Sequence, residues 1–381
     1  MACRVIVLGA GLVGGPMAAD LAHDPRLQVS LADRDPQALA RTAGLGAIAP
    51  IQRDLGDPAA VRDLVRGFDL VVGAMPGWLG FQTLQACLEA GRNVVDISFF
   101  SEDPFMLDDL ARSGGATAVV DCGVFPGLGS VLVGDAARRL GQVDSVLVLV
   151  GGLPVIRRLP FEYKAVFSPL DVIEEYTRAA RFLEKGTLVT RPALSDPELV
   201  DIPGIGTLEA FNTDGLRTLL TTIDAPDMKE KTLRYPGHAA RMEFLRDCGF
   251  FRTERVSVPG GTVRPVDVTA ALLFPQWRLE PTEADLTVLR VEVQGQSGRR
   301  RVRWVCDLVD RYDPAAQVTS MARTTGYTAA VVARMVAEGI YREPGISPPE
   351  FLGRRPEWVQ TLTRELARRR VTFTWRELPE G

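Results

Sequence analysis

The sequence predicts an α/β protein, in which a doubly wound parallel sheet is followed by a second, α+β domain with a mixed sheet. Three observations support this. Short apolar runs alternate with helical segments over the first 124 residues, a glycine-rich turn follows the first run, and the character of the chain changes near residue 125. Strands that alternate with helices at this spacing form parallel sheets with both faces covered, which explains their continuously apolar character.

Six strands are expected in residues 1–124, each a short run rich in apolar or β-branched residues, with helices between them. The expected strands are 4–8, 28–32, 47–52, 70–74, 93–97 and 117–121, and the expected helices are 16–23, 58–66, 79–90 and 102–112.

Residues 125–315 are expected to form the α+β domain, and residues 316–381 a set of C-terminal helices. The runs near residues 290 and 305 alternate apolar with polar residues, which is typical of a sheet with one face in water. A long amphipathic helix is expected to end at Gly339, and Trp358, Leu362 and Leu366 share one face of a later helix. The expected elements are helices 126–140 and 318–338 and strands 145–150, 256–258, 266–271, 286–294 and 301–308.

The composition excludes several classes of protein. A net charge of −4 creates no strong field for nucleic acid or anionic lipid. No apolar run approaches the roughly 20 residues of a membrane helix, and the N-terminus passes directly into an expected strand, so we expect no leader and a cytoplasmic protein. The 381 residues suffice for two or three domains.

Metal and disulfide chemistry is not expected. No CxxC pair occurs, the cysteine count is odd, and two histidines are too few for a His-rich site. Cys122 and Cys248 are expected to pack rather than to act as nucleophiles. The residues in question are Cys3, Cys87, Cys122, Cys248 and Cys306, with His23 and His238.

The turn Gly9-Ala10-Gly11-Leu12-Val13-Gly14 predicts a dinucleotide site of the Rossmann type. It has the GxGxxG spacing, follows an expected strand at once and opens a helix. Gly9 and Gly11 permit the tight turn and close approach of a pyrophosphate, and Gly14 allows the helix to pack on the strand. The helix N-terminus offers N–H groups to the phosphates.

Asp33 ends the second expected strand, 19 positions after Gly14. A carboxylate there accepts hydrogen bonds from the adenosine ribose and repels a 2′-phosphate, which favours NAD over NADP. Arg34 leaves NADP open, because it can stack on the adenine or approach a 2′-phosphate. Two further segments follow strands at the same edge. Asp54-Leu55 is expected to border the adenine, and Ala74-Met75-Pro76 the nicotinamide ribose.

Several longer segments resemble the saccharopine dehydrogenase-like family. They are VIVLGAGLVGG at the start, NVVDIS at 93–98, DCGVFPGLGS at 121–130, VGGLP at 150–154, EYKAVFSP at 162–169, LEAFNTDGLRTL at 208–219, TLRYPGHAARMEFLRDCGF at 232–250 and GISPPE at 345–350. Within this family the lysine 6-dehydrogenase pattern is nearest, although Tyr163-Lys164 is more similar to saccharopine reductase.

The resemblance implies a Rossmann domain, a mixed-sheet substrate domain, C-terminal helices that return to the first domain, and a homodimer. It also implies hydride transfer from a carbon that bears nitrogen. For L-lysine, the ε-amine would be removed by oxidation, giving the semialdehyde and ammonia. This chemistry needs a deprotonated amine, a group that handles protons during hydrolysis and a cation for the α-carboxylate.

Five residues are candidates for the proton chemistry. Asp96 and Asp121 end the fifth and sixth expected strands, where each is either a base or ammonium ligand, or a loop cap. Lys164, beside Tyr163, is either a base with a pKa lowered by burial or a solvent-facing lysine. His238 is either a proton carrier or a buried histidine with satisfied hydrogen bonds.

Four further residues are candidates for substrate binding. Arg234 and Arg241 flank His238, and a guanidinium suits a carboxylate, although surface arginines are common. Asn212 and Thr213 offer polar contacts.

Three functions remain open. The leading hypothesis is an NAD-dependent lysine dehydrogenase, and the alternative is an enzyme of the saccharopine reductase type. A third hypothesis, from another functional class, is a catalytically silent NAD(H) sensor.

Overall fold

In the computed structural model, which describes residues 2–280 and 283–379, contacts divide the chain into two units. The first unit runs to Leu140 and also contains Met321–Phe373. The second unit contains Gly141–Ser320 and the residues from Thr374 onward. The first unit thus extends beyond the expected boundary at 124, and the chain end belongs to the second unit. Residues 380–381 of the expected C-terminal range lie outside the described residues.

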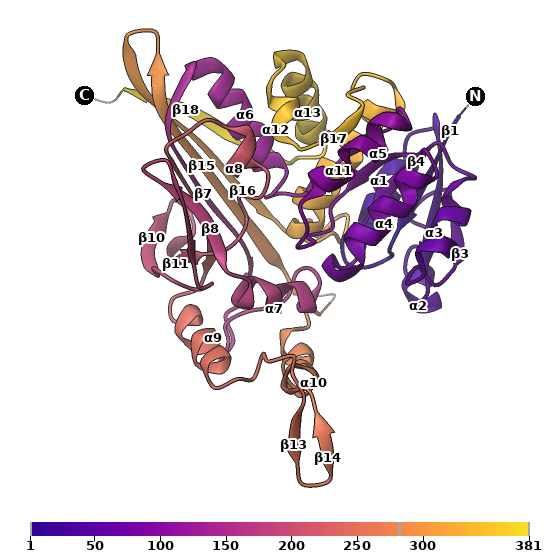
Figure 1. Ribbon diagram of the computed structural model, residues 1–381. Helices are drawn as coiled ribbons and strands as arrows, with labels where there is room; N and C mark the ends of the chain where they lie inside the picture. The colour runs from indigo at the N-terminus through magenta and orange to yellow at the C-terminus, as the bar shows by residue number, and fades with distance from the viewer. Residues whose placement is uncertain (1, 281–282, 380–381) are drawn as a thin grey trace. The chain divides into compact units, whose positions relative to one another are not determined.

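The first unit is built on a parallel sheet (Figure 1), in which seven described strands pair in the order β17-β6-β5-β4-β1-β2-β3. The expected doubly wound sheet is therefore confirmed. The strand β17 comes from the far end of the chain and pairs with β6. The strands are β1 Cys3–Leu8, β2 Leu27–Asp33, β3 Ile48–Gln52, β4 Leu70–Gly73, β5 Asn93–Asp96, β6 Thr117–Val119 and β17 Gly345–Ser347.

Helices cover both faces of this sheet. Ile6 and Leu8 point to the face where residues of α3, α4 and α5 form a core cluster. The helices α1 and α11 contact each other, and α11 also contacts β4 and β5. The helices are α1 Gly14–Ala22, α2 Pro36–Ala40, α3 Pro58–Val65, α4 Gly77–Glu89, η1 Pro104–Leu107, α5 Asp108–Ser113, α6 Leu128–Leu140, η2 Ala322–Gly326, α11 Tyr327–Ala337, α12 Glu350–Gly353 and α13 Pro356–Arg368.

Local sequence signals account for several helix starts. Asp35 and Asp57 each precede a proline, and their side chains accept a hydrogen bond from the backbone N–H two residues later. This arrangement satisfies a donor of the first turn while proline fills a position that needs none. The expected helix over 318–338 is a π-helical segment, η2, followed by α11, and Gly339 has a φ of +69° at its end.

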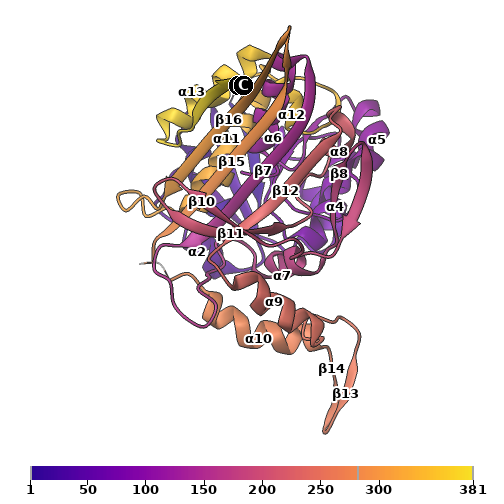
Figure 2. The same ribbon diagram turned by 90° about the vertical axis from the view of Figure 1, so that its left-hand side faces the viewer.

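The second unit is built on a mixed sheet, whose long central strands lie side by side in Figure 2. The described strands pair in the order β10-β11-β12-β7-β15-β16-β18, and β8 pairs with β12 and β9. The β12–β7 pair is parallel, whereas β7–β15 and β15–β16 are antiparallel. The strands are β7 Gln142–Pro154, β8 Ala180–Glu184, β9 Thr187–Arg191, β10 Glu198–Ile202, β11 Gly206–Asn212, β12 Asp227–Arg234, β13 Val256–Val258, β14 Gly261–Val263, β15 Asp285–Ser297, β16 Arg300–Arg311 and β18 Thr374–Pro379.

The expected strand over 266–271 is wrong, because these residues lie in helix α10. Pro265 occupies the first helical position, where its fixed φ suits a helix start. Val266, Leu273 and Trp277 are buried, so the segment has a helical apolar face although it begins with an alternating pattern. The helices of this unit are α7 Pro169–Thr177, α8 Leu219–Thr222, α9 His238–Asp247 and α10 Pro265–Trp277.

Among the described residues, no helix has both the length and the apolar character needed to cross a membrane.

Candidate functional site

In the glycine turn between β1 and α1, a side chain would clash with the backbone at two of the glycines and would have space at the third. A β-carbon built on Gly9, which has a φ of +104°, would lie 2.5 Å from the Ala74 carbonyl oxygen. A β-carbon on Gly14 would lie 2.0 Å from the Gly9 carbonyl oxygen. No atom lies within 4 Å of a β-carbon on Gly11. The turn therefore needs glycine at Gly9 and Gly14 for its own packing, and Gly11 leaves space for a ligand to approach the backbone.

Asp33 holds this turn in place. Its Oδ2 accepts a hydrogen bond of 2.7 Å from the backbone N–H of Ala10, and its Oδ1 accepts one of 2.8 Å from that of Asp35. The carboxylate thus couples the end of β2 to the glycine turn. Its predicted contact with an adenosine ribose stays a prediction, and Arg34, the next residue, is exposed.

The other predicted cofactor residues follow strands of the same sheet. Asp54 is exposed after β3 and accepts a hydrogen bond from the Gly56 N–H, and Leu55 is part of the core. Ala74, Met75 and Pro76 follow β4 and lead into α4. In the turn itself, Leu12 is half exposed and Val13 is buried. All of these residues lie at the carboxyl edge of the parallel sheet, where such folds bind their ligands.

Asp96 is the last residue of β5 and Asp121 follows β6, so both lie at the same edge, and both are buried. Asp96 accepts hydrogen bonds from the N–H and the hydroxyl of Ser98. The Cys122 N–H donates to the Asp96 carbonyl oxygen at 2.8 Å, so the two aspartates lie on directly connected backbone. Asp121 has a φ of +52°, a conformation that is uncommon outside glycine. The structure therefore brings two buried carboxylates to the edge that carries the glycine turn.

The second unit places two predicted catalytic residues, Tyr163 and His238, in one buried cluster. Their rings lie 5.2 Å apart, and Tyr163 also packs edge-on against Trp277 at 5.5 Å. Tyr176, on α7, exchanges a hydrogen bond of 2.8 Å with Nε2 of His238. Aromatic packing and hydrogen bonding therefore fix the positions of these rings.

His238 is neutral in this cluster. Burial is the main cause that lowers its pKa to about 3, and the positive charge of Arg234 lowers it further. With Nδ1 donating to the Phe161 carbonyl oxygen at 3.1 Å, Nε2 accepts from the Tyr176 hydroxyl. Both ring nitrogens are thus satisfied, as expected for a structural histidine, although the residue also contacts the predicted site residues around it.

Arg234, on β12, is the buried cation of the cluster. It donates to Glu175 Oε2 at 2.7 Å and to the Leu233 carbonyl oxygen at 3.0 Å. Its guanidinium carbon lies 4.7 Å from the centre of the Tyr163 ring. Burial raises the pKa of Glu175, while Arg234 acts in the opposite direction. Arg234 is therefore already engaged by a carboxylate of its own unit.

Lys164 is bound elsewhere than its neighbour Tyr163. Its Nζ donates to the Arg278 carbonyl oxygen at 2.8 Å and lies 3.4 Å from Glu283 Oε2. The adjacent Ala165 forms a β-bridge with Arg278. Lys164 thus ties the segment after β7 to the end of α10, and its role as a base stays a prediction.

Several buried polar atoms of the second unit make no hydrogen bond to any described residue. They include three from predicted site residues, Tyr163 Oη, Arg241 Nη1 and Asn212 Oδ1, and also Trp277 Nε1. Among the described residues, Arg241 is paired with Glu162, at a distance of 3.7 Å between Nη1 and Oε2. Buried polar atoms almost always have a partner, so these atoms are suited to hydrogen bonds with a polar ligand.

A second polar cluster surrounds Glu230, which the sequence did not single out. The predicted residue Thr213 donates to its carboxylate at 2.7 Å and lies 2.8 Å from the hydroxyl of Thr232, and the Gly215 N–H donates to the same carboxylate at 3.0 Å. Burial raises the pKa of Glu230 to about 8. Thr213 is thus a hydrogen-bond donor to Glu230. The predicted contact of Thr213 with substrate stays a prediction.

We expect Glu230→Gln to flatten the pH dependence of stability. The unfolded chain loses this proton near pH 4.5, whereas the folded chain holds it up to about pH 8. Stability therefore falls as pH rises through this window, by about 1.4 kcal/mol per pH unit at most. Urea unfolding at a series of pH values measures this slope. The exposed Glu243→Gln is the matched control, and an unchanged slope in Glu230→Gln would refute the prediction.

Comparisons with known proteins agree with this architecture. Family models described as the saccharopine dehydrogenase NADP binding domain and the saccharopine dehydrogenase C-terminal domain match residues 5–119 and 123–371. The chain belongs to the saccharopine dehydrogenase family. The resemblance seen in its sequence motifs is thereby confirmed at the level of the family.

Relatives within the saccharopine dehydrogenase family are distant. The mitochondrial alpha-aminoadipic semialdehyde synthase of Mus musculus is 27% identical over 66% of this chain, which spans 29% of that protein. The carboxynorspermidine synthase of Vibrio cholerae is 25% identical over 77% of this chain and 75% of its own length. The apo saccharopine dehydrogenase (L-Glu forming) of Saccharomyces cerevisiae has the same fold, with a TM-score of 0.79 at 20% identity over 99% of this chain and all of that one.

Proposed function

We propose that this member of the saccharopine dehydrogenase family oxidises a carbon–nitrogen bond of an amino acid with a nicotinamide dinucleotide. The specific reaction proposed is the oxidative deamination of the ε-amine of L-lysine. The observation that carries this proposal is the pair of buried carboxylates, Asp96 and Asp121, at the sheet edge that carries the glycine turn. Two carboxylates there provide the charge that binds an ammonium group and the acceptors that take up its protons.

The residues of this sheet edge have two proposed roles, which are cofactor binding and proton transfer from the amine. The glycine turn would hold the pyrophosphate at Gly11, and NAD, when bound, would supply an acceptor for the hydride that leaves the ε-carbon. Asp96 and Asp121 orient the amine and remove a proton from it, because only the neutral amine supports loss of hydride. One lysine, one NAD⁺ and one water give the aldehyde, NADH, ammonium and one proton.

Within the second unit, taken by itself, two arginines can be compared as ligands for a carboxylate. Arg234 is bonded to Glu175, whereas Arg241 has a buried Nη1 without a hydrogen bond to any described residue. We therefore propose Arg241 rather than Arg234 as the carboxylate ligand, with Tyr163 Oη as a second donor. Tyr163 is suited to donate, because burial is the main cause that keeps its pKa well above the usual range, and its hydroxyl stays protonated.

A panel of amines tests the reaction. Purified protein is incubated with NAD⁺ or NADP⁺ and L-lysine, L-ornithine or a diamine, and both reduced nicotinamide and ammonia are measured. We expect equal amounts of the two products with L-lysine. The absence of turnover with every amine would refute the proposal, and cofactor binding without any turnover would instead indicate an NAD(H) sensor.

A reaction of the saccharopine type is the second candidate, and the names of the relatives favour it. Such a reaction joins an amino acid to a semialdehyde, or separates them, without release of ammonia. Its substrate carries several carboxylates, for which the unbonded donors of Tyr163 and Arg241 are also suited. Oxidation of reduced nicotinamide that requires both glutamate and a semialdehyde would select this reaction over lysine deamination.

We propose NAD as the preferred cofactor, on the basis of the Asp33 carboxylate at the end of β2. The description of the matching family model as NADP binding supports the opposite preference. The homodimer expected from the family resemblance also stays a proposal, which light scattering tests.

Asp33→Asn is expected to shift the preference toward NADP by about tenfold, since a charge contact near a protein surface contributes about 1–4 kcal/mol at 4 Å. The amide oxygen still accepts the hydrogen bond from the Ala10 N–H, which holds the glycine turn, whereas the amide nitrogen cannot accept the second bond, from the Asp35 N–H. Titration with both reduced cofactors gives the ratio of Kd values. Asp57→Asn, which makes the same change at a helix cap away from the turn, is the control. An unchanged ratio in Asp33→Asn would mean that the carboxylate does not set the preference.

A further inference from the structure

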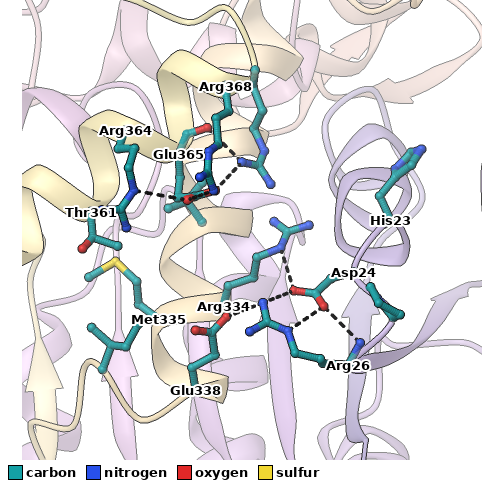
Figure 3. Close-up of a pocket in the computed structure, with 14 residues that line it drawn as sticks. His23, Asp24, Arg26, Arg334, Met335, Glu338, Thr361, Arg364, Glu365 and Arg368 are labelled. Carbon is teal, nitrogen blue, oxygen red and sulfur yellow. Dashed lines mark hydrogen bonds and ion pairs between the residues drawn. The ribbon is translucent and has the colours of Figure 1, made fainter.

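A cavity lies in the first unit, formed by residues that none of the proposed chemistry uses (Figure 3). Its volume is about 490 Å³, which lies within the range of about 300–1,000 Å³ for small-molecule sites. Its walls come from three parts of the chain, which are the segment 23–26 after α1, the second half of α11 and the face of α13 around Arg364.

This cavity is separate from the glycine turn. Helix α1 starts at the turn with Gly14 and ends with Ala22, and the cavity residues 23–26 lie between that end and the start of β2. The carboxyl ends of the parallel strands form the cofactor edge, so the start of β2 lies at the opposite edge of the sheet. A ligand in the cavity therefore occupies a different place from the dinucleotide.

Arginines outnumber carboxylates among the described residues that line the cavity. The lining arginines are Arg26, Arg334, Arg364, Arg368 and Arg369, and the lining carboxylates are Asp24, Glu338 and Glu365. Each of two carboxylates is shared by more than one arginine. Asp24 contacts Arg26 and Arg334, and Glu365 contacts Arg364, Arg368 and Arg369.

Arg364 and Arg368 both line the cavity. They lie one turn apart on α13 and therefore on the same side of the helix. The opposite stripe of this helix, with Trp358, Leu362 and Leu366, is buried. Arg364 contacts Glu365 through Nε at 3.6 Å, and Arg368 contacts the same carboxylate through Nη1 at 2.7 Å. One carboxylate cannot occupy the planar donor forks of both guanidinium groups, so donors remain that suit a second anion.

The floor of the cavity is held rigidly. Arg334 is only 8% exposed, and its Nη1 donates to Asp20 Oδ2 at 2.6 Å. Arg369 donates from Nε to the other oxygen of Asp20 at 2.7 Å. Helices α1, α11 and α13 are therefore tied together beneath the exposed arginines, which reduces the conformational freedom lost on binding.

We propose that this cavity binds a small organic or inorganic polyanion that carries at least two carboxylate or phosphate groups. Arg364 and Arg368 bind one anionic group. Arg26, on the opposite wall, binds another through Nη1, because its Nε and Nη2 are engaged by Asp24 and Glu338. A planar guanidinium binds carboxylate and phosphate through paired hydrogen bonds, so both chemistries fit the same residues.

Isothermal titration of the full chain with citrate and with pyrophosphate tests the proposal at constant ionic strength. At least one probe is expected to bind with a Kd below that of acetate, used as a single-charge reference. Arg364→Ala/Arg368→Ala is expected to weaken binding at least about tenfold, because each lost charge-assisted hydrogen bond contributes about that factor. Binding of citrate alone identifies a polycarboxylate ligand, and binding of pyrophosphate alone a phosphate ligand.

Three controls make the test specific. Arg66→Ala/Arg300→Ala removes two exposed arginines that do not line the cavity and is expected to bind as the wild type does. Gly11→Ala changes the dinucleotide turn and is also expected to leave binding intact. Glu365→Gln removes the competing carboxylate and is expected to tighten binding several-fold.

Two results would overturn the proposal. One is that neither probe binds the wild type more tightly than acetate. The other is that Arg364→Ala/Arg368→Ala, with an unchanged melting temperature, binds as tightly as the wild type.

Discussion

Gly14→Ala is expected to raise the Kd for the dinucleotide by about 5- to 150-fold. The added β-carbon would lie 2.0 Å from the Gly9 carbonyl oxygen and 3.1 Å from the Ala74 β-carbon. Neither neighbour is the end of a flexible side chain, so the turn and the start of α1 must separate. Such overpacking costs about 1–3 kcal/mol, which corresponds to that range of Kd. Fluorescence titration with reduced cofactor measures the change.

Substitutions at two further glycines distinguish an effect on cofactor binding from an effect on stability. Gly11→Ala adds a β-carbon with no neighbour within 4 Å, so we expect an unchanged melting temperature together with weaker cofactor binding. Gly67→Ala, whose nearest neighbour would lie at 3.7 Å, is expected to change neither property. Equal cofactor affinity in Gly11→Ala and in the wild type would show that the turn does not hold the pyrophosphate.

Arg234→Met is expected to destabilise the protein by about 3–5 kcal/mol, because it leaves the Glu175 carboxylate without its buried cation. The replacement keeps an unbranched apolar side chain but removes the guanidinium, with its bond of 2.7 Å to Glu175 and its contact with the Tyr163 ring. Tyr176 also loses the contact of 3.4 Å from Arg234 Nε. Urea unfolding of the single variant against the wild type measures the loss.

A double-mutant cycle with Glu175 identifies the cause. If the loss comes from an uncompensated charge, Arg234→Met/Glu175→Met recovers most of it, since replacing both members of a buried pair by apolar groups is often neutral. Arg138→Met, which removes an arginine from a partly exposed pair with Asp135, is the control and is expected to cost about 1 kcal/mol or less. Additive losses in the double variant would contradict this explanation.

The parallel sheet and its glycine turn could be predicted because the signals are local. The runs over 4–8 and 70–74 are apolar throughout, the turn follows the first at once, and Asp33 lies at the expected interval. β17 could not be predicted in the same way. It has only three residues, and its partner β6 lies more than two hundred positions earlier in the chain.

The second unit was less predictable because its strands depend on distant partners. The run 266–271 alternates like a strand, yet Pro265 and the buried Trp277 make it a helix. β8 to β12 lacked a periodic signal strong enough to predict them, and they are stabilised by pairing with β7 and with one another.

In the candidate site, too, residues in local motifs could be predicted, whereas residues that depend on distant partners could not. Tyr163, Arg234 and His238 were selected from motifs, and the structure brings them together. Their partners Glu175 and Tyr176 were missed, because a glutamate and a tyrosine on a helix give no sign in a single sequence that both will be buried. Glu230 was missed for the same reason, since its hydrogen-bond donors Thr213 and Gly215 come from the loop after β11.

The first unit is discontinuous in the chain, and this affects its synthesis. When the ribosome has made the residues through α6, the sheet still ends at β6, whose open edge has no partner until β17 is made. The whole second unit up to Ser320 must emerge before α11, β17 and α13 can complete the cofactor-binding half. The nascent chain therefore carries an unfinished sheet edge for more than half of its translation, and such edges promote association between chains. Binding of a chaperone during this interval would protect that edge, and translation stalled just before residue 345 would leave it open.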